Sequence, residues 1–248
     1  MSKTVLISGG SRGIGRAAAL LMATQGWRVA LTYHSDREAA EQTVRECDAV
    51  GAAAIAIKGN TAVEADVLHA FDETLGAFGS LDAVIVNAGV VAPKLPLAEM
   101  TVDRLRHVFD TNVLGAFLFA REAARRMPAN MSKGDGSIVI VSSAAARLGS
   151  PNEYVDYAAS KGAMDTFTIG LSKELAASGI RVNAVRPGLI ETDIHASGGQ
   201  PDRAQRLGKT VPLARAGTAK EVAAVIGWLC SAEASYCTGA IIDVAGGR

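Results

Sequence analysis

Short apolar runs rich in β-branched residues alternate with longer segments of helical periodicity along this chain of 248 residues. Most of the runs are apolar on both faces, as expected of parallel strands that helices cover on each side. This alternation predicts an α/β fold with a doubly wound, Rossmann-like parallel sheet of about seven strands flanked by helices. The expected strands are 4–8, 28–33, 53–58, 82–86, 137–142, 181–185 and 240–244, and the expected helices are 13–25, 37–50, 64–78, 101–127, 157–178 and 219–230.

We expect one domain over residues 1–248, because no linker, low-complexity stretch or internal repeat interrupts the alternation. An α/β fold often reaches this length as a single domain. Residues 191–218 depart from the pattern, since glycine and proline recur there among charged residues, just after an expected strand. Loops at the carboxyl ends of strands border the ligand crevice of an open sheet, so this segment suits a mobile flap. An ordinary surface insertion is the alternative.

Composition argues against several classes of protein. The 25 basic and 25 acidic side chains balance, which gives no basic patch for a nucleic acid. No apolar run approaches the ~20 residues that span a bilayer, and the first residues are too short an apolar stretch for a signal peptide. The 3 cysteines and 4 histidines are scattered, so neither a disulfide framework nor a metal site is predicted. We therefore expect a cytoplasmic protein without nucleic-acid or membrane partners.

A glycine-rich turn, SGGSRGIG at residues 8–15, joins the first expected strand to the first expected helix. Glycines there permit a tight turn, close approach of the backbone to a pyrophosphate, and close packing of helix on strand. The helix that follows directs its unpaired N–H groups and the positive end of its dipole toward the phosphates. Strand, glycine turn and helix in this order predict a dinucleotide site. A glycine-rich turn without a ligand is the alternative.

The end of the second strand, TYHSDR at residues 32–37, bears on the choice of nicotinamide cofactor. A site for NAD usually places Asp or Glu at this strand end, where it bonds the ribose hydroxyls. No acid occupies the strand end itself here, and Arg12 in the glycine turn offers a cation for a 2′-phosphate, with Arg37 as a weaker second cation. Asp36 follows a few positions later and weakens the case. The sequence favours NADP over NAD.

Tyr157 and Lys161 lie four residues apart at the start of a long helical segment. Residues at this spacing share a helix face, so the phenol and the ammonium can lie side by side. A neighbouring cation stabilises the phenolate and lowers the phenol's pKa from its ordinary value of about 10, which suits acid/base work. Such pairs also occur by chance on surface helices, so the surrounding residues decide.

Polar groups follow three other expected strands. Ser142 and Ser143 end the fifth strand, RPGLIET at 186–192 follows the sixth, and NAG at 87–89 follows the fourth. In an open sheet the ligand crevice lies outside the carboxyl ends of the strands. A hydroxyl at that edge can hydrogen-bond a substrate oxygen. The convergence of these groups predicts an active site there.

Taken together, these motifs resemble those of the short-chain dehydrogenase/reductase family, especially its bacterial β-ketoacyl-carrier-protein reductases and glucose dehydrogenases. The likeness extends over essentially the whole chain. It is carried by SGGSRGIG for the family's TGxxxGxG, NAG within its NNAG, DTNVLGAF with the helix asparagine Asn112, a serine before YAASK, and RPGLIET. The resemblance implies hydride transfer between NADP(H) and a carbonyl or secondary-alcohol substrate.

The resemblance also implies a role for each matching residue. Tyr157 would exchange a proton with the substrate oxygen, which Ser143 would orient and stabilise. Lys161 would lower the pKa of the tyrosine and hold the nicotinamide ribose, and Asn112 would keep a water in a proton relay. The expected cofactor contacts are Gly9, Ser11, Arg12, Gly13, Ile14, Gly15, His34, Ser35, Asn60, Thr61, Asn87, Ala88, Gly89, Tyr157, Lys161, Pro187, Gly188, Ile190 and Thr192.

The sequence departs from the family pattern at a few positions. Ser8 replaces a threonine, Val86 replaces the first asparagine of NNAG, and Asn60 stands where an aspartate usually contacts adenine. The interval from serine to tyrosine is one residue longer than is common, which favours Ser143 over Ser142. None of these changes removes a member of the expected tetrad.

Two further expectations concern assembly and function. The apolar faces of helices 101–127 and 157–178 exceed what one helix face needs, which predicts a subunit interface. The family commonly forms tetramers in this way, so a homotetramer is expected, and a thick intramolecular core is the alternative. The alternative function is a non-catalytic NADP-binding regulator. Among substrates, acyl thioesters, sugars and small ketones stay open.

Overall fold

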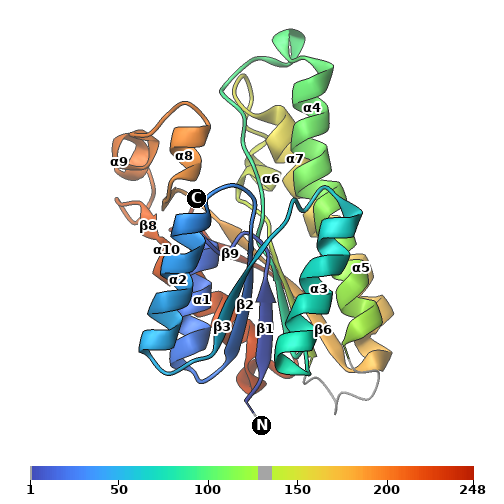
Figure 1. Cartoon of the computed structure of the whole chain (residues 1–248). Coiled ribbons are helices and arrows are strands. Elements are labelled where there is room, and N and C mark those ends of the chain that lie inside the picture. The colour runs from blue at the N-terminus through green and yellow to red at the C-terminus, as the bar shows by residue number, and fades with distance from the viewer. Residues whose placement is uncertain (1, 128–135) are drawn as a thin grey trace.

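The computed structural model describes residues 2–127 and 136–248. Its centre is one sheet in the order β3-β2-β1-β4-β5-β6-β9, and every pairing between these strands is parallel (Figure 1). The doubly wound, seven-stranded sheet expected from the sequence is confirmed. The strands are β1 (Thr4–Ile7), β2 (Arg28–Tyr33), β3 (Ala54–Lys58), β4 (Ala83–Val86), β5 (Gly136–Val141), β6 (Ile180–Pro187) and β9 (Ile241–Val244).

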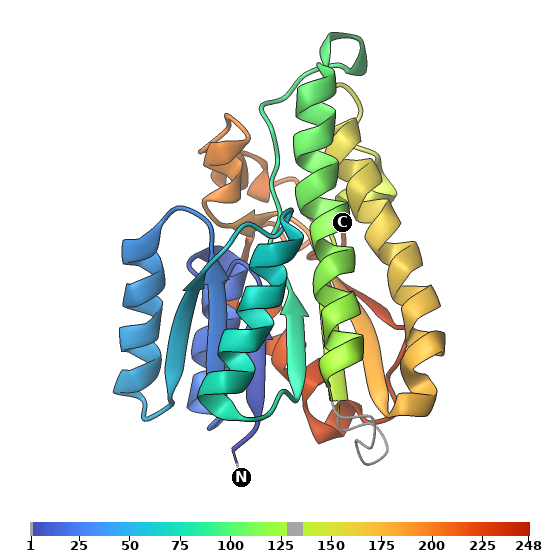
Figure 2. The same ribbon diagram turned by 45° about the vertical axis from the view of Figure 1, so that its right-hand side comes forward.

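Helices cover both faces of the sheet (Figures 1 and 2). One face packs against α1 (Gly13–Thr24), α2 (Arg37–Ala49) and α10 (Ala219–Cys230). The other packs against α3 (Glu64–Phe78), α5 (Gly115–Arg126) and α7 (Val155–Leu175). Successive strand residues point to opposite faces, so Val5 and Ile7 join the first apolar cluster and Leu6 joins the second. This two-sided burial explains why the strands are apolar throughout.

The helix expected over 101–127 contains a π-helical turn. It consists of α4 (Val102–Phe109), the π-helical residues Asp110–Leu114, and α5, which together form one rod beside α7 in Figure 2. Gly115 follows the π turn at a close crossing, since a Cβ there would lie 2.9 Å from the Thr61 carbonyl oxygen. Turns of this kind often mark functional positions, and this one carries Asn112.

Residues 191–218 contain secondary structure of their own. β7 (Ile190–Glu191) pairs with β8 (Gly217–Thr218), and α8 (Ile194–Ser197) and α9 (Arg203–Gly208) lie between them. A small apolar cluster of Leu189, Ala204, Val211 and Ala216 holds the segment together. It stands beside the carboxyl edge of the sheet, in orange in Figure 1. A mobile flap therefore stays a prediction, now for a folded segment rather than an irregular loop.

The remaining helices are short. They are α6 (Ala145–Leu148) and three 3₁₀ turns, at Leu97–Glu99, Ala176–Ser178 and Ala232–Ala234. Thr218 and Glu221 form a reciprocal capping box that begins α10. Within the described ranges, no helix combines the length and the apolar character needed to cross a membrane.

Candidate active site

A cavity of about 840 Å³ lies along the carboxyl edge of the sheet, a size typical of small-molecule and cofactor sites. Its wall contains the glycine turn, the residues that follow β2 to β6, and the start of α7. Every expected cofactor-contact residue lines this cavity except Gly15, which lies behind the glycine turn. Of the expected tetrad, Ser143, Tyr157 and Lys161 line it, whereas Asn112 is buried behind the wall.

The glycine turn is shaped by contacts that a side chain would block. Gly9 and Gly13 have φ angles of +66° and +56°, in the left-handed region that favours glycine. A Cβ at Gly15 would lie 2.3 Å from the Gly9 carbonyl oxygen and 2.5 Å from Asn87 Nδ2. Asn87 Nδ2 donates to the carbonyl oxygens of Ser8 and Gly9, at 3.0 and 2.9 Å. The turn is thus bound to the loop that follows β4.

Ser8 has a structural role that the sequence analysis did not assign to it. Its Oγ accepts hydrogen bonds from the backbone N–H groups of Asn87 and Ala88, at 2.9 and 3.0 Å. These bonds join the ends of β1 and β4, the two strands at which the sheet order changes direction. A serine hydroxyl accepts them as a threonine hydroxyl would, so this departure from the family pattern leaves the turn intact.

The N-terminus of α1 fits a phosphate group. Arg12, its N-cap residue, makes no side-chain cap, and the first turn of α1 contains no acidic residue. The first N–H groups of the helix lack acceptors within it, and Gly13 and Ile14 line the cavity. Thr192 covers this turn, because a Cβ at Gly13 would lie 3.4 Å from Thr192 Cγ2. Unpaired N–H donors, a positive dipole end and no side chain at Gly13 together fit a dinucleotide pyrophosphate.

The side chains beyond β2 distinguish the two expected cations. His34, Ser35 and Asp36 all line the cavity, and the Asp36 carboxylate accepts from Ala39 N at 3.0 Å and so caps α2. Arg37 pairs with Glu41 one turn further along α2, with 2.6 Å between Nε and Oε1, and does not line the cavity. The expectation that Arg37 supplies a second cation is therefore not supported. Arg12 is exposed, lines the cavity and pairs with no acid among the described residues.

The side chains of Tyr157 and Ser143 lie close enough in the cavity wall for Ser143 to act on the tyrosine hydroxyl. Lys161 lies on the same side of α7, with Nζ 5.7 Å from the centre of the Tyr157 ring, and donates to the Val141 carbonyl oxygen at 2.7 Å. Ser142 points the other way: its Oγ donates to Asp165 Oδ1 at 2.7 Å. The structure thus brings Ser143, not Ser142, to the tyrosine.

Burial controls the two pKa values in this group. Desolvation of its hydroxyl raises the pKa of Tyr157, and the hydrogen bond with Ser143 opposes part of that rise. Burial also lowers the pKa of Lys161 to about 8, against the opposing charge of Asp165. The lowering of the tyrosine pKa expected from Lys161 is not found here: burial raises that pKa, and the opposing influence comes from Ser143. With its proton retained at neutral pH, Tyr157 is suited to donate that proton to a carbonyl oxygen.

Asn112 joins two parts of the cavity wall. Its Oδ1 accepts from Val90 N at 2.8 Å, and its Nδ2 donates to the Val90 carbonyl oxygen at 2.9 Å and to Ser160 Oγ at 3.1 Å. The side chain is 1% exposed and fixes the loop after β4 to α7. Its expected part in a water relay stays a prediction.

Sequence reasoning missed two ion pairs beside the site. Arg104 on α4 binds Asp156 through two bonds of 2.8 and 3.2 Å, and Asp156 directly precedes Tyr157. Arg186 at the end of β6 binds Asp165, four residues after Lys161. The positions of Asp156 and Asp165 relative to the YxxxK pair are a signal that the sequence offered. Their arginine partners lie 52 and 21 residues away and carried no such signal.

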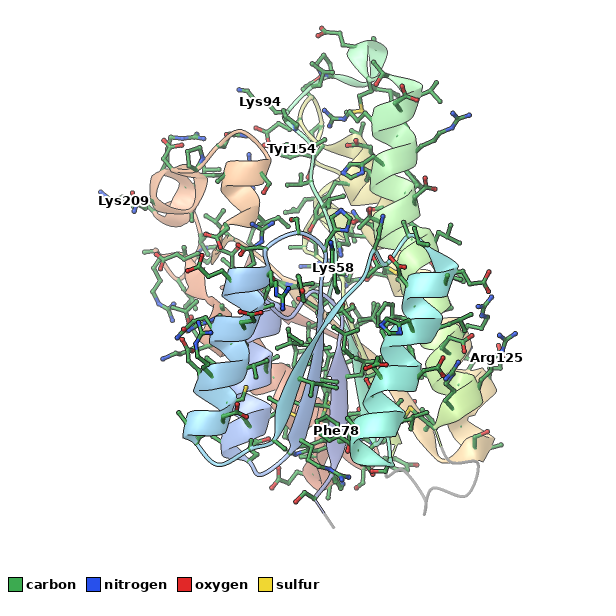
Figure 3. All side chains as sticks on the ribbon, viewed as in Figure 1. Lys58, Phe78, Lys94, Arg125, Tyr154 and Lys209 are labelled. Carbon is green, nitrogen blue, oxygen red and sulfur yellow. The ribbon has the colours of Figure 1, made fainter. Side chains whose placement is uncertain are left out.

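The far end of the cavity was also missed. Residues from the loop before α7 and from the 191–218 segment meet there: Tyr154 donates to the Gly198 carbonyl oxygen at 3.3 Å and accepts from Gln200 Nε2 (Figure 3). Arg203 pairs with Glu153 at 2.8 Å and stacks over the Tyr154 ring. In the described parts of the chain, no three His, Cys, Asp or Glu side chains are grouped to hold a metal ion.

Comparisons with known proteins found similar proteins over nearly the whole chain. The family model described as enoyl-(acyl carrier protein) reductase matches residues 9–248. The chain is 48% identical to the uncharacterized oxidoreductase YgfF of Escherichia coli over 98% of both chains. It is 36% identical to 3-oxoacyl-[acyl-carrier-protein] reductase FabG of Staphylococcus aureus, over 100% of this chain and 98% of that protein. A crystal structure of 3-ketoacyl-(acyl-carrier-protein) reductase from Brucella melitensis complexed with NADH superposes with a TM-score of 0.90, at 30% identity, over 99% of this chain and 98% of that one.

Proposed function

The chain belongs to the short-chain dehydrogenase/reductase family of oxidoreductases, and from this premise we propose that it transfers a hydride between NADP(H) and a carbonyl or secondary-alcohol substrate. One observation carries the proposal. Ser143 and Tyr157, whose side chains interact, lie with Lys161 in the same cavity as the glycine turn. A phosphate-binding turn and an acid/base group that share one cavity suit cofactor-dependent chemistry at a polar carbon–oxygen bond.

The chain's own residues bind the cofactor, orient the substrate oxygen and move a proton. A bound nicotinamide cofactor supplies the hydride. Tyr157 donates a proton from its hydroxyl to the substrate oxygen in reduction and accepts one in oxidation. Ser143 orients that oxygen. Lys161 uses one N–H on the Val141 carbonyl, which leaves its other N–H groups for the ribose hydroxyls.

A screen of NADPH consumption over a panel of carbonyl compounds tests the proposal. The family and its named relatives support a panel of β-ketoacyl thioesters, sugars and small ketones. We expect the wild-type chain to reduce at least one of these classes. A non-catalytic NADP-binding regulator has no specific observation in its favour. The cytoplasmic address and the lack of nucleic-acid partners expected from the sequence stay predictions.

Arg12 is expected to decide the preference for NADP over NAD. Arg12→Ala removes a cation from the mouth of the phosphate site, so we expect the Kd of NADPH to rise roughly ten-fold, the scale of one charge-assisted hydrogen bond. The Kd of NADH should stay nearly constant, since NADH has no 2′-phosphate. Fluorescence titration of both cofactors measures this. Arg37→Ala is the matched control, because Arg37 is paired with Glu41 outside the cavity. Equal losses for both cofactors in Arg12→Ala contradict the assignment.

We propose a homotetramer in which the rod of α4 and α5 packs with α7 against a second copy of the chain. Phe117 and Phe167 stack with ring centres 3.8 Å apart, and Phe117 is 44% exposed. Phe109, Leu114 and Ile169 are exposed nearby on the same helices. Apolar surface gathered on two adjacent helices suits a symmetric interface better than contact with water.

Phe117→Glu should break this interface, because it places a charge in an apolar contact. We expect the assembly to fall from four copies to two or one, measured by light scattering coupled to size-exclusion chromatography. Val50→Glu is the control, since Val50 is 52% exposed at the end of α2, on the opposite face of the sheet. If the Phe117→Glu assembly keeps the mass of the wild-type assembly, the interface lies elsewhere.

A further inference from the structure

Asp165 is a nearly buried carboxylate that the proposed reaction does not use. It lies on α7 one turn after Lys161 and is 8% exposed. Ser142 Oγ donates to its Oδ1 at 2.7 Å, and Arg186 Nε and Nη2 donate to its Oδ2 at 2.9 and 2.8 Å. Both oxygens are therefore fixed in place. Asp165 therefore forms an ion pair with Arg186 and accepts a further hydrogen bond from Ser142.

The same contacts join Asp165 to the site. Ser142 Oγ also lies 3.1 Å from the main-chain oxygen of Lys161, so one hydroxyl spans the turn between the lysine and the aspartate. Ser142 separates Ser143 from Val141, whose carbonyl oxygen holds Lys161 Nζ. Arg186 directly precedes the Pro187-Gly188 turn in the cavity wall. The ion pair thus touches three segments that form the site.

Few other charges surround Lys161. Residues at i and i+4 face the same side of a helix, so Asp165 is the nearest acid on α7. Asp156, on the same helix, is neutralised by Arg104 of α4. The loop after β4 presents the Asn87 amide and carries Lys94, which lies near Glu153, and β5 is followed by the hydroxyls of Ser142 and Ser143. Other titratable or charged groups on this helix and on the described elements packed against it include Tyr157 on α7, His107 on α4, Asp110 on the π-helical turn, Arg147 on α6 and Arg186 on β6.

We propose that Asp165 is a positioning residue of the active site: it holds a negative charge one turn beyond Lys161 and keeps that buried lysine in its ammonium form. Arg186 fixes the carboxylate and offsets part of its charge. The inference rests on the proposed function only for its consequence, which is that the ammonium persists for cofactor and proton handling. The ionisation of Lys161 can be read without turnover.

The two members of the ion pair make opposite predictions. Asp165→Asn keeps the size and an acceptor oxygen but removes the negative charge, so the pKa of Lys161 should fall by about one pH unit from its value of about 8. Arg186→Gln removes the offsetting cation, so the pKa of Lys161 should rise. A loss of packing alone would not shift the pKa of Lys161 in opposite directions in the two variants. Asp165→Glu retains the charge and should restore a midpoint near that of the wild type.

The measurement is a pH titration by NMR of protein labelled with ¹³C at lysine Cε, in which the Lys161 signal is identified by its loss in Lys161→Arg. Opposite shifts in Asp165→Asn and Arg186→Gln support the proposal. No shift, or shifts of the same sign, overturns it. If Asp165→Asn does not fold, Arg186→Gln decides alone: a rise supports the proposal, and a fall or no change overturns it.

A second readout separates this inference from the proposed function. The alkaline limb of kcat/KM for carbonyl reduction should move with the NMR midpoint in each variant. NMR shifts in a protein that reduces no carbonyl in the panel contradict the proposed function and leave the role of Asp165 standing. Conversely, a protein that reduces a carbonyl but whose Lys161 midpoint shifts in neither variant supports the proposed function and contradicts the role of Asp165.

Discussion

Tyr157→Phe is expected to lower kcat for carbonyl reduction by about 10³-fold, the scale of a lost general acid. The change removes one oxygen, which interacts with the Ser143 side chain, and leaves the ring beside Lys161. Because the glycine turn and the N-terminus of α1 are untouched, the Kd of NADPH should stay within about two-fold of the wild-type value. Consumption of NADPH at saturating substrate and fluorescence titration of the cofactor measure the two effects.

Tyr154→Phe is the matched control for this substitution. Tyr154 lines the same cavity three residues earlier, but its hydroxyl bonds Gly198 and Gln200 in the 191–218 segment rather than Ser143. Its loss should therefore raise KM and leave kcat within a few-fold of the wild type. A Tyr157→Phe variant that retains wild-type kcat removes the tyrosine from the proton transfer, and equal losses of kcat in the two variants show that the cavity as a whole was damaged.

Gly15→Ala should both lower the stability of the folded chain and weaken its binding of the cofactor. The added Cβ would meet the Gly9 carbonyl oxygen at 2.3 Å and Asn87 Nδ2 at 2.5 Å, and a main-chain atom cannot yield as the end of a flexible side chain does. Overpacking of this kind costs about 2 kcal/mol in the free energy of unfolding. If the same distortion falls on the phosphate-binding turn, the Kd of NADPH rises roughly thirty-fold. Urea denaturation and fluorescence titration measure these quantities.

Gly76→Ala provides the same chemical change without the close contact. Gly76 lies inside α3, and a Cβ there meets nothing within 4 Å. Because alanine favours a helix interior over glycine by about 1 kcal/mol, this variant should be slightly more stable and should bind cofactor normally. Gly15→Ala with wild-type affinity for NADPH would show that the turn does not bear on the cofactor site.

Most of the candidate site could be predicted from local patterns in the sequence. The glycine turn and the YxxxK pair are each contained within a few residues, so spacing along one strand or one helix face is enough to predict their geometry. The serines that end β5 and the NAG and RPG turns could be placed at one edge because parallel strands share their carboxyl ends. The choice of Ser143 over Ser142 followed from an interval, and the structure brings that residue to Tyr157.

Several features of the site could not be predicted from the sequence patterns that were used. Arg37 offered a cation in the right stretch of chain, yet Glu41 on the same helix holds it outside the cavity. Lys161 was expected to lower the pKa of Tyr157, but burial raises that pKa, and burial depends on everything packed around the hydroxyl. The π-helical turn at Asn112 and the apolar cluster of the 191–218 segment likewise have no signature in spacing alone.

The sequence alone was enough to predict the layered fold, which the structure confirms, and to propose a site and its reactive groups, because these predictions depend on periodicity and on spacing within single elements. Which charged side chains pair with one another beside the candidate site became clear from the packed structure alone. The pairing of Arg104 with Asp156 and of Arg186 with Asp165 joins residues from different elements. Electrostatic effects depend on distance through space and on exclusion of water, and neither quantity exists until the chain has packed.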